Sequence, residues 1–208
     1  MLIKKLILGP VQANCFILGC EETNEAVVID PGDESERIID VLEKSKLNIK
    51  YIINTHGHFD HSGANADLKK ATNAEILIHS EDAHMLGELS QMSKMFGLEA
   101  KNSPPADRML KDGDEIVFGK ITLKVMHTPG HSRGGISIYS DGVLFSGDTL
   151  FAGSIGRTDF PGGDMDILIS SIQKKLFVLD ENVKVYPGHM GETTIGNEKN
   201  NNPYVKNF

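Results

Sequence analysis

The chain has 208 residues, with 21 Lys and Arg against 29 Asp and Glu, and a formal net charge of −8 at pH 7. This acidic balance argues against a protein that binds nucleic acid through its phosphates, because such binding needs a basic surface. Apolar residues make up 39% of the sequence and charged residues 24%, a composition that excludes an intrinsically disordered chain and predicts one folded domain over residues 1–208.

The N-terminal region is interpreted as two β-strands and not as an export signal. Its first apolar run is interrupted by Gly9 and Pro10, so no continuous hydrophobic region of a signal peptide remains. No later window approaches the ~18 apolar residues of a membrane span. The two cysteines, Cys15 and Cys20, are too few for a disulfide framework. We therefore expect a cytoplasmic protein that is not attached to a membrane.

Short apolar runs, rich in β-branched residues and bounded by Gly, Asn, Asp or Pro, predict the strands. In chain order they cover residues 2–8, 15–18, 26–29, 51–53, 75–78, 115–118, 121–126, 135–139, 143–145 and 183–186. Helices are expected between these strands, because a sheet in a chain of this mixed order must be covered by helical layers. The fold class is therefore α/β.

Helical periodicity of the apolar residues appears in residues 35–44, 63–70 and 164–176. Asp33 and Asp164 precede two of these stretches and are predicted to be N-caps, because a carboxylate there can accept from the free N–H groups of the first turn. Residues 86–107 have no clear period and contain many Met, Ser, Lys and Pro. We interpret this segment as a helix fragment and a long loop, which is either a lid over a site or a surface excursion.

The most informative feature is the run T-H-G-H-F-D-H at residues 55–61, directly after a predicted strand. His56, His58, Asp60 and His61 are potential ligands that cannot all point one way on a strand or a helix. They suit a loop that wraps a metal, and imidazole with carboxylate favours zinc or another first-row transition metal. Three ligands and a water would make one catalytic site, whereas four neighbouring ligands with different directions suggest two metals.

Three more ligand-type side chains follow predicted strands after tight Gly or Pro turns: His131, Asp148 and His189. Polar residues that gather outside the carboxyl ends of strands mark the binding site of α/β proteins. The turns before them are suited to carrying a side chain into a cleft. These residues are therefore candidates to complete the metal site.

The other histidines are weaker candidates for metal ligands. His127 lies four residues before His131 at a predicted strand end, and it is a candidate for supporting a ligand from behind. His79 and His84 flank the start of a predicted helix. Isolated histidines are commonly solvated, so we expect both at the surface.

In this order, the motifs T-H-G-H-F-D-H, T-P-G-H-S, F-S-G-D-T-L-F and Y-P-G-H resemble those of the metallo-β-lactamase superfamily. Finer segments, G-P-V-Q-A-N-C at residues 9–15 and A-G-S-I-G-R-T-D-F at residues 152–160, are similar to the short bacterial glyoxalase II-like hydrolases, or hydroxyacylglutathione hydrolase-like enzymes. The resemblance covers the chain from about Pro10 onward. It implies a four-layer αββα sandwich, with two sheets between helical layers and the site at one edge.

The resemblance also implies which residues hold the metals. The first ion would be held by His56, His58 and His131, the second by Asp60, His61 and His189, with Asp148 bridging the two. Asp30 matches a position that supports the site from a strand end without ligating. The ions would be divalent, with zinc expected and iron or manganese as the alternatives. Met190 stands where these short enzymes usually have glycine.

The activity implied is that of a dinuclear hydrolase that cleaves an anionic thioester, such as S-D-lactoylglutathione, by attack of a metal-bridging hydroxide. Two divalent ions lower the pKa of bound water toward neutrality, and a thiolate leaves readily without a strong general acid. Asp60 and Asp148 are the expected catalytic carboxylates, and Arg157 is the candidate for binding the anionic group. The expected partner is a small molecule, neither nucleic acid nor membrane, and the oligomeric state is left open.

Two other activities are compatible with the same motifs. Persulfide dioxygenases resemble this family and use one iron with two His and one carboxylate, which here would be His56, His131 and Asp148. The chain keeps four further ligand positions that such a site does not need. A hydrolase of another ester or of a lactone would use the same cluster with a different pocket. A non-catalytic zinc module is disfavoured, because structural zinc sites are usually closed and rich in Cys.

Overall fold

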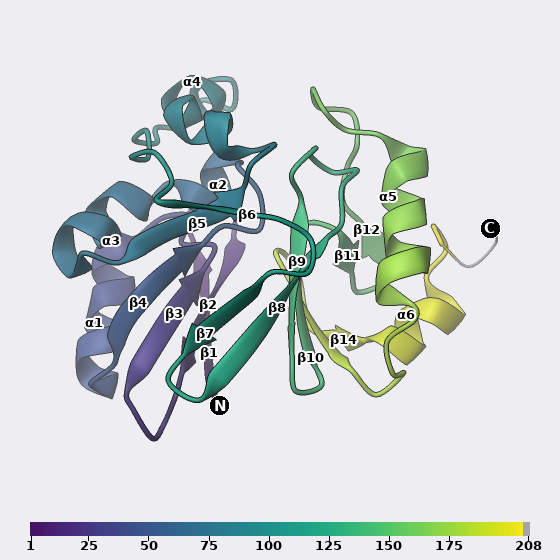
Figure 1. The fold of residues 1–208 in the computed structure, drawn as a ribbon. Helices are drawn as coiled ribbons and strands as arrows, with labels where there is room; N and C mark the ends of the chain where they lie inside the picture. Colours follow the sequence, from purple (N-terminus) through teal and green to yellow (C-terminus); the bar gives the residue numbers. More distant parts are fainter. Residues whose placement is uncertain (206–208) are drawn as a thin grey trace.

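A computed structural model describes residues 1–205 of the chain. Two six-stranded sheets form the centre of the fold, and helices cover the outer face of each sheet (Figure 1). The layers therefore follow the order helix, sheet, sheet, helix. This is the αββα sandwich that the sequence motifs imply.

The first sheet has the strand order β1-β2-β3-β4-β5-β6. Its first three strands pair antiparallel and the others parallel. The bounds are β1 (Leu2–Leu8), β2 (Ala13–Gly19), β3 (Glu25–Ile29), β4 (Asn48–Ile53), β5 (Glu75–His79) and β6 (Arg108–Leu110). Strand β6 was not predicted, because three residues are too few to show an alternating pattern.

Helices α1 (Ser35–Ser45) and α3 (Asn65–Thr72) cover the outer face of this sheet (Figure 1). Ile38 and Leu42 of α1 and Leu68 of α3 belong to the apolar cluster between sheet and helices. The prediction of Asp33 as the N-cap of α1 is wrong, since Glu34 occupies that position. Asp33 instead accepts a hydrogen bond from the Glu34 N–H, at 2.7 Å from its Oδ1, so its carboxylate serves the turn that precedes the helix.

The second sheet has the order β14-β13-β10-β9-β8-β7. Strands β10 and β13 pair parallel and all the other neighbours antiparallel. The bounds are β7 (Glu115–Phe118), β8 (Ile121–His127), β9 (Ile136–Ser140), β10 (Val143–Gly147), β13 (Lys184–Pro187) and β14 (Thr193–Thr194). A two-stranded ribbon of β11 (Leu150–Phe151) and β12 (Ser154–Ile155) follows β10.

Helices α5 (Met165–Ser171) and α6 (Ile195–Asn201) cover the outer face of the second sheet (Figure 1). A π-helical turn, Ile172–Leu176, continues α5, so the predicted helix over 164–176 is confirmed. Asp164 is its N-cap, as expected, and its carboxylate accepts from the N–H of Ile167 at 3.0 Å.

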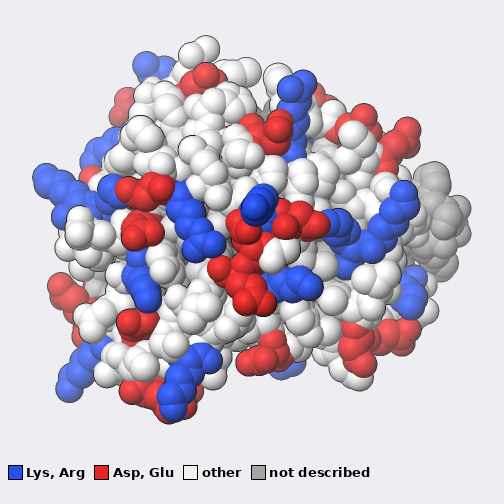
Figure 2. All heavy atoms as spheres, viewed as in Figure 1, with Lys and Arg blue, Asp and Glu red and all other residues white. Residues whose placement is uncertain are grey.

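The segment between β5 and β6 contains a 3-10 turn (Ala83–Gly87), helix α4 (Leu89–Lys94) and a long loop, which agrees with the predicted helix fragment and loop. Figure 1 shows α4 at the top of the view. Among residues 1–205, no helix has both the length and the apolar character needed to cross a bilayer. Figure 2 shows Lys and Arg side chains interleaved with Asp and Glu over the visible face.

Aromatic rings fill the space between the two sheets. The ring of Phe145 on β10 lies 5.1 Å from that of Phe16 on β2 and stacks on Tyr186 at 5.3 Å. Phe145 has no exposed surface. Both cysteines are buried and free, and a buried free thiol packs as a small apolar group. The inner faces of the two sheets are therefore held together by apolar contacts.

Replacing Phe145 with alanine is expected to lower the free energy of unfolding by about 3–5 kcal/mol, because it leaves a cavity between the sheets. Urea denaturation followed by circular dichroism measures this change. Val178→Ala is the control, since Val178 is 72% exposed and its truncation is expected to change stability by less than about 0.5 kcal/mol. Equal effects of the two substitutions would contradict the assignment of Phe145 to the core.

Candidate metal centre

The predicted site residues converge at one edge of the sandwich, where strands of both sheets end. Asp30 follows β3 and His56 follows β4 in the first sheet. His131, Asp148 and His189 follow β8, β10 and β13 in the second sheet. The carboxyl ends of strands are where α/β folds place their ligands. The site therefore draws on both halves of the chain.

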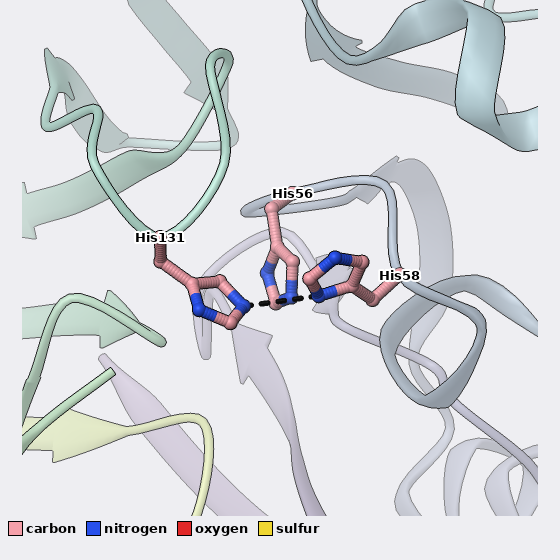
Figure 3. Close-up of side chains that lie close together, drawn as sticks. All are labelled: His56, His58 and His131. Atoms are coloured by element: carbon pink, nitrogen blue, oxygen red, sulfur yellow. Dashed lines mark hydrogen bonds between the residues drawn. The ribbon is translucent and has the colours of Figure 1, made fainter. Parts of the chain in front are cut away.

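The first group consists of His56, His58 and His131, which are all buried. Their three rings point toward one another (Figure 3), and one nitrogen of each lies within 4.8 Å of the others. His131 Nε2 and His58 Nδ1 are 3.0 Å apart. Three imidazole nitrogens at this spacing can surround one metal ion.

The second group consists of Asp60, His61 and His189, whose ligand atoms also lie within 4.8 Å of one another. His189 Nε2 is 3.2 Å from His61 Nε2 and 3.3 Å from Asp60 Oδ2. The sequence predicted a loop over the whole run 55–61, but Phe59–Ser62 forms one helical turn, α2. This turn directs Asp60 and His61 to the second group, while His56 and His58 precede it.

Asp148 lies between the two groups. Its Oδ2 is 3.7 Å from His131 Nε2 and 3.6 Å from His189 Nε2. Gly188 allows the close approach of the chain next to His189, because a Cβ there would collide with the Asp148 carboxylate. This placement satisfies the geometric requirement for a ligand shared by two ions.

Two buried atoms of the cluster, His56 Nε2 and Asp148 Oδ1, have no hydrogen-bond partner among the described residues. A buried polar atom without a partner is rare because it is costly. Both atoms belong to the two groups or to the carboxylate between them. The donor set of imidazole nitrogens and carboxylate oxygens therefore fits a pair of divalent metal ions.

The outward-facing nitrogens of three ligand histidines each meet an oxygen acceptor. The pairs are His56 Nδ1 with Thr55 Oγ1 at 3.1 Å, His61 Nδ1 with Asp30 Oδ2 at 3.0 Å, and His131 Nδ1 with the Arg157 carbonyl oxygen at 2.7 Å. A ring that donates from Nδ1 keeps the lone pair of Nε2 free for a metal. These contacts therefore set the rings in the tautomer that metal binding needs.

The protonation states of the two groups differ. Burial lowers the pKa of His56 well below its ordinary value and that of His58 to about 3, and neighbouring histidines add to the effect. Burial also acts to lower the pKa of His61, but three nearby carboxylates outweigh it and raise this pKa to about 10. Burial thus favours the neutral form of the first two rings, whereas the carboxylates around His61 favour its charged form, in which a metal would compete with a proton for Nε2.

A cavity of about 780 Å³ opens directly over the cluster. Five of the predicted ligands line it, namely His58, Asp60, His131, Asp148 and His189. Its size falls within the roughly 300–1,000 Å³ of small-molecule sites. The candidate metal centre is therefore accessible to a substrate.

The sequence matches the family model described as the metallo-beta-lactamase superfamily over residues 8–189. The chain belongs to the metallo-β-lactamase superfamily. A relative from Haemophilus influenzae, named hydroxyacylglutathione hydrolase GloC, is 40% identical over 198 residues, which cover 93% of each chain. The family and the names of these relatives support an enzyme of the metallo-hydrolase type.

Solved structures of superfamily members share the whole fold. The BLEG-1 B3 metallo-beta-lactamase has a TM-score of 0.92 and 39% identity, with 98% of this chain and 99% of that chain covered. The protein TTHA1623, solved in a di-iron-bound form, has a TM-score of 0.90 and 36% identity, with 97% and 99% covered. In this chain, the metallo-β-lactamase fold brings His and Asp side chains into groups that could hold a metal ion. This arrangement supports divalent metals as cofactors.

Asp30 supports the second group through its contact with His61. It is 2% exposed and has a left-handed backbone with φ of 52°. Besides His61, it accepts from the Thr55 N–H at 2.7 Å and from the Thr55 hydroxyl at 2.6 Å. Both carboxylate oxygens are thus occupied by protein donors, as expected for a residue that supports the site without ligating.

The substitution Asp30→Asn should weaken metal binding to the second group by about 10–100-fold, because partners behind a ligand histidine typically contribute this much. Titration with a chromogenic chelator measures the affinities of both sites. Asp40→Asn, at an exposed position of α1, is the control. Unchanged affinities in Asp30→Asn would show that Asp30 has no part in orienting His61.

Sequence reasoning missed Asp82, which is 1% exposed. Its carboxylate accepts from the Ser132 hydroxyl and from the Gly134 N–H, both at 2.6 Å, and from the Gly57 N–H at 3.2 Å. It therefore joins the loop of His56 and His58 to the loop of His131. No local motif marks it, because its partners lie 25 to 52 residues away in the chain.

The expectation that His79 lies at the surface is wrong. Its side chain is buried and its ring stacks on that of His127, with centroids 4.0 Å apart and an interplanar angle of 10°. His127 Nε2 meets the Arg133 carbonyl oxygen at 2.9 Å, so it contacts the His131 loop and none of the predicted ligands. His84 is exposed, as expected. The stack of His79 on His127 at the end of β5 is a tertiary contact that its isolated position in the sequence does not reveal.

Two predicted rim residues line the cavity. Arg157 is exposed, donates twice to Asp159 at 2.7 Å, and stacks on the Phe160 ring at 3.8 Å from the centroid. Met190 is 57% exposed and has a φ of 68°. This left-handed conformation favours glycine, which agrees with the glycine usual at this position in the similar enzymes. The Met190 side chain narrows the cavity beside His189.

Proposed function

We propose that this chain is a dinuclear metal-dependent thioesterase, which hydrolyses a small anionic acyl-thiol such as S-D-lactoylglutathione. The observation that carries the proposal is the pair of His and Asp groups on either side of Asp148, at the floor of a substrate-sized cavity. The relative named hydroxyacylglutathione hydrolase adds support for the substrate class. Zinc is the proposed metal, with iron and manganese as alternatives.

Metal ions held by these residues would supply a Lewis acid and a water of lowered pKa. The protein side of the site holds its ligands in fixed orientations through Thr55, Asp30 and the Arg157 carbonyl. Ser132, beside His131 in the chain, donates to Asp82 and so is not activated as a nucleophile by a histidine. Because a thiolate leaves readily, the proposed reaction requires no protein acid at the leaving group.

Arg157 is the proposed contact for the anionic part of the substrate. Its Nε and Nη2 are paired with Asp159, which leaves the Nη1 donors outside this pair. We expect Arg157→Ala to raise KM about tenfold for anionic thioesters, because a charge-assisted hydrogen bond is lost, with little change for neutral ones. Arg37→Ala, which removes another ion-paired arginine outside the cavity, is the control. Equal effects on both substrate types would reject this role.

The decisive experiment combines elemental analysis with a turnover screen of the purified protein. Lactoylglutathione, other thioesters, lactones and a persulfide are the substrates. Two metal ions per chain and hydrolysis of thioesters are expected. Hydrolysis of a lactone without any thioester would reject the proposal, and so would a single iron with oxygen uptake on the persulfide.

A further inference from the structure

Large apolar side chains gather in one part of the cavity lining, although they face solvent. They are four side chains from the segment between β5 and β6: Met85, Met92, Met95 and Phe96. We call these residues the Met–Phe wall. Met95 is 80% exposed and Phe96 is 48% exposed. A group of large apolar side chains left open in this way is typical of a binding surface.

The Met–Phe wall begins beside the loop that carries two of the predicted metal ligands. Met85 packs against Gly57, the residue between His56 and His58, so closely that a Cβ on Gly57 would lie 2.6 Å from the Met85 Cβ. The inner end of the wall therefore contacts the chain between two predicted ligands of the first group. A substrate that reacts at the cluster has this wall beside it.

Aromatic rings extend the wall across the mouth of the cavity. Phe96 packs on Phe59 of α2, with ring centroids 5.5 Å apart, and meets the edge of Phe160 at 5.9 Å. Phe160 in turn lies 5.8 Å from the His58 ring. Through Phe96 the wall therefore contacts Phe160, and Phe160 in turn contacts the predicted ligand His58.

The cavity lining also carries cationic side chains. Arg133 and Arg157 both line the cavity. Arg157 is ion-paired with Asp159, whereas Arg133 has no ion-pair partner among residues 1–205. The cavity therefore offers both large apolar side chains and two arginines to a substrate, and Glu81 and Glu88 also line it.

We infer that the site selects thioesters with an extended apolar acyl group, which lies along the Met–Phe wall while the anionic thiol part faces Arg133 and Arg157. This inference rests on the proposed thioesterase function. A lactoyl group is short and carries a hydroxyl, so it would leave most of the wall uncovered. Methionine side chains adapt to ligands of different shape, and the wall therefore suits a range of chain lengths.

The test is a series of acetyl, butyryl, hexanoyl and octanoyl thioesters of one anionic thiol. For the wild-type protein, kcat/KM is expected to rise about two- to fourfold for each methylene added between acetyl and hexanoyl. The upper value of this range corresponds to full burial of one CH₂ group. Butyryl is expected to exceed lactoyl on the same thiol. The double substitution Met95→Ser with Phe96→Ser should flatten the dependence on chain length.

Met109→Ser is the matched control, because Met109 is 51% exposed on β6 and lies outside the cavity lining. It should keep the wild-type dependence on chain length. A flat wild-type series with measurable thioester hydrolysis would overturn the inference and leave the proposed function standing. An unchanged dependence in the double variant, shown to be folded by circular dichroism, would also overturn it. No hydrolysis of any thioester would instead reject the proposed function.

Discussion

Asp148→Ala is expected to abolish the pairing of metal ions and catalytic turnover together. Asp148 lies between the two ligand groups, with its Oδ2 at 3.7 Å from His131 Nε2 and 3.6 Å from His189 Nε2. Its loss leaves several imidazoles facing one another without the negative charge between them. Loss of a partner behind one ligand already costs 10–100-fold, so we expect kcat/KM to fall by more than about 100-fold.

Elemental analysis of the purified variant should find at most one metal ion per chain, where two are expected for the wild type. Asp166→Ala, in the exposed first turn of α5, controls for the loss of a surface carboxylate and should retain both ions. Two ions per chain with normal turnover in Asp148→Ala would show that the bridging assignment is wrong.

Asp82→Ala is expected to have the largest effect on stability of any single change near the site. The carboxylate is buried and accepts from Gly57, Ser132 and Gly134. Alanine would leave these three donors without a partner, and hydrogen bonds to charged groups contribute about 1.5–3 kcal/mol each. We expect the free energy of unfolding to fall by about 3 kcal/mol or more.

Urea denaturation and the metal content of Asp82→Ala should both be measured. Because Asp82 connects the two loops of the first ligand group, its loss should weaken metal binding there as well as stability. Glu81→Ala, at the exposed neighbouring position, is the control. Wild-type stability with wild-type metal content would contradict the role assigned to the Asp82 carboxylate.

The sequence predicts the regular elements well because each has its own periodic pattern. Strands β1 (Leu2–Leu8) and β7 (Glu115–Phe118) have the predicted bounds, and α1 extends only one residue beyond its prediction. Strands β6, β11, β12 and β14 have two or three residues each, too few for any period to appear. Strand β6 also depends on pairing with β5, from which a long segment separates it, and no local pattern records that pairing. Strands β11 and β12 pair with each other, and β14 pairs with β13.

The candidate ligands could be predicted because they are chemically distinctive and clustered in short motifs, and the structure brings them into two groups around Asp148. Their binding of metal stays a prediction. Asp82 and the stack of His79 on His127 escaped prediction, because their contacts join residues that are far apart in the chain. The pairing of Arg157 with Asp159 is local, but its orientation over Phe160 is set by the folded loop.

The contribution of ligands by both sheets has a consequence for protein synthesis. Residues of the first half of the chain supply Asp60 and His61, but the second group is complete only after His189, which follows β13 near the end of the chain. A ribosome must therefore release the polypeptide beyond β13 before the three side chains of the second group can meet. An ion that binds only the folded form stabilises that form, so late metal capture would secure the two halves of the newly made chain against separation.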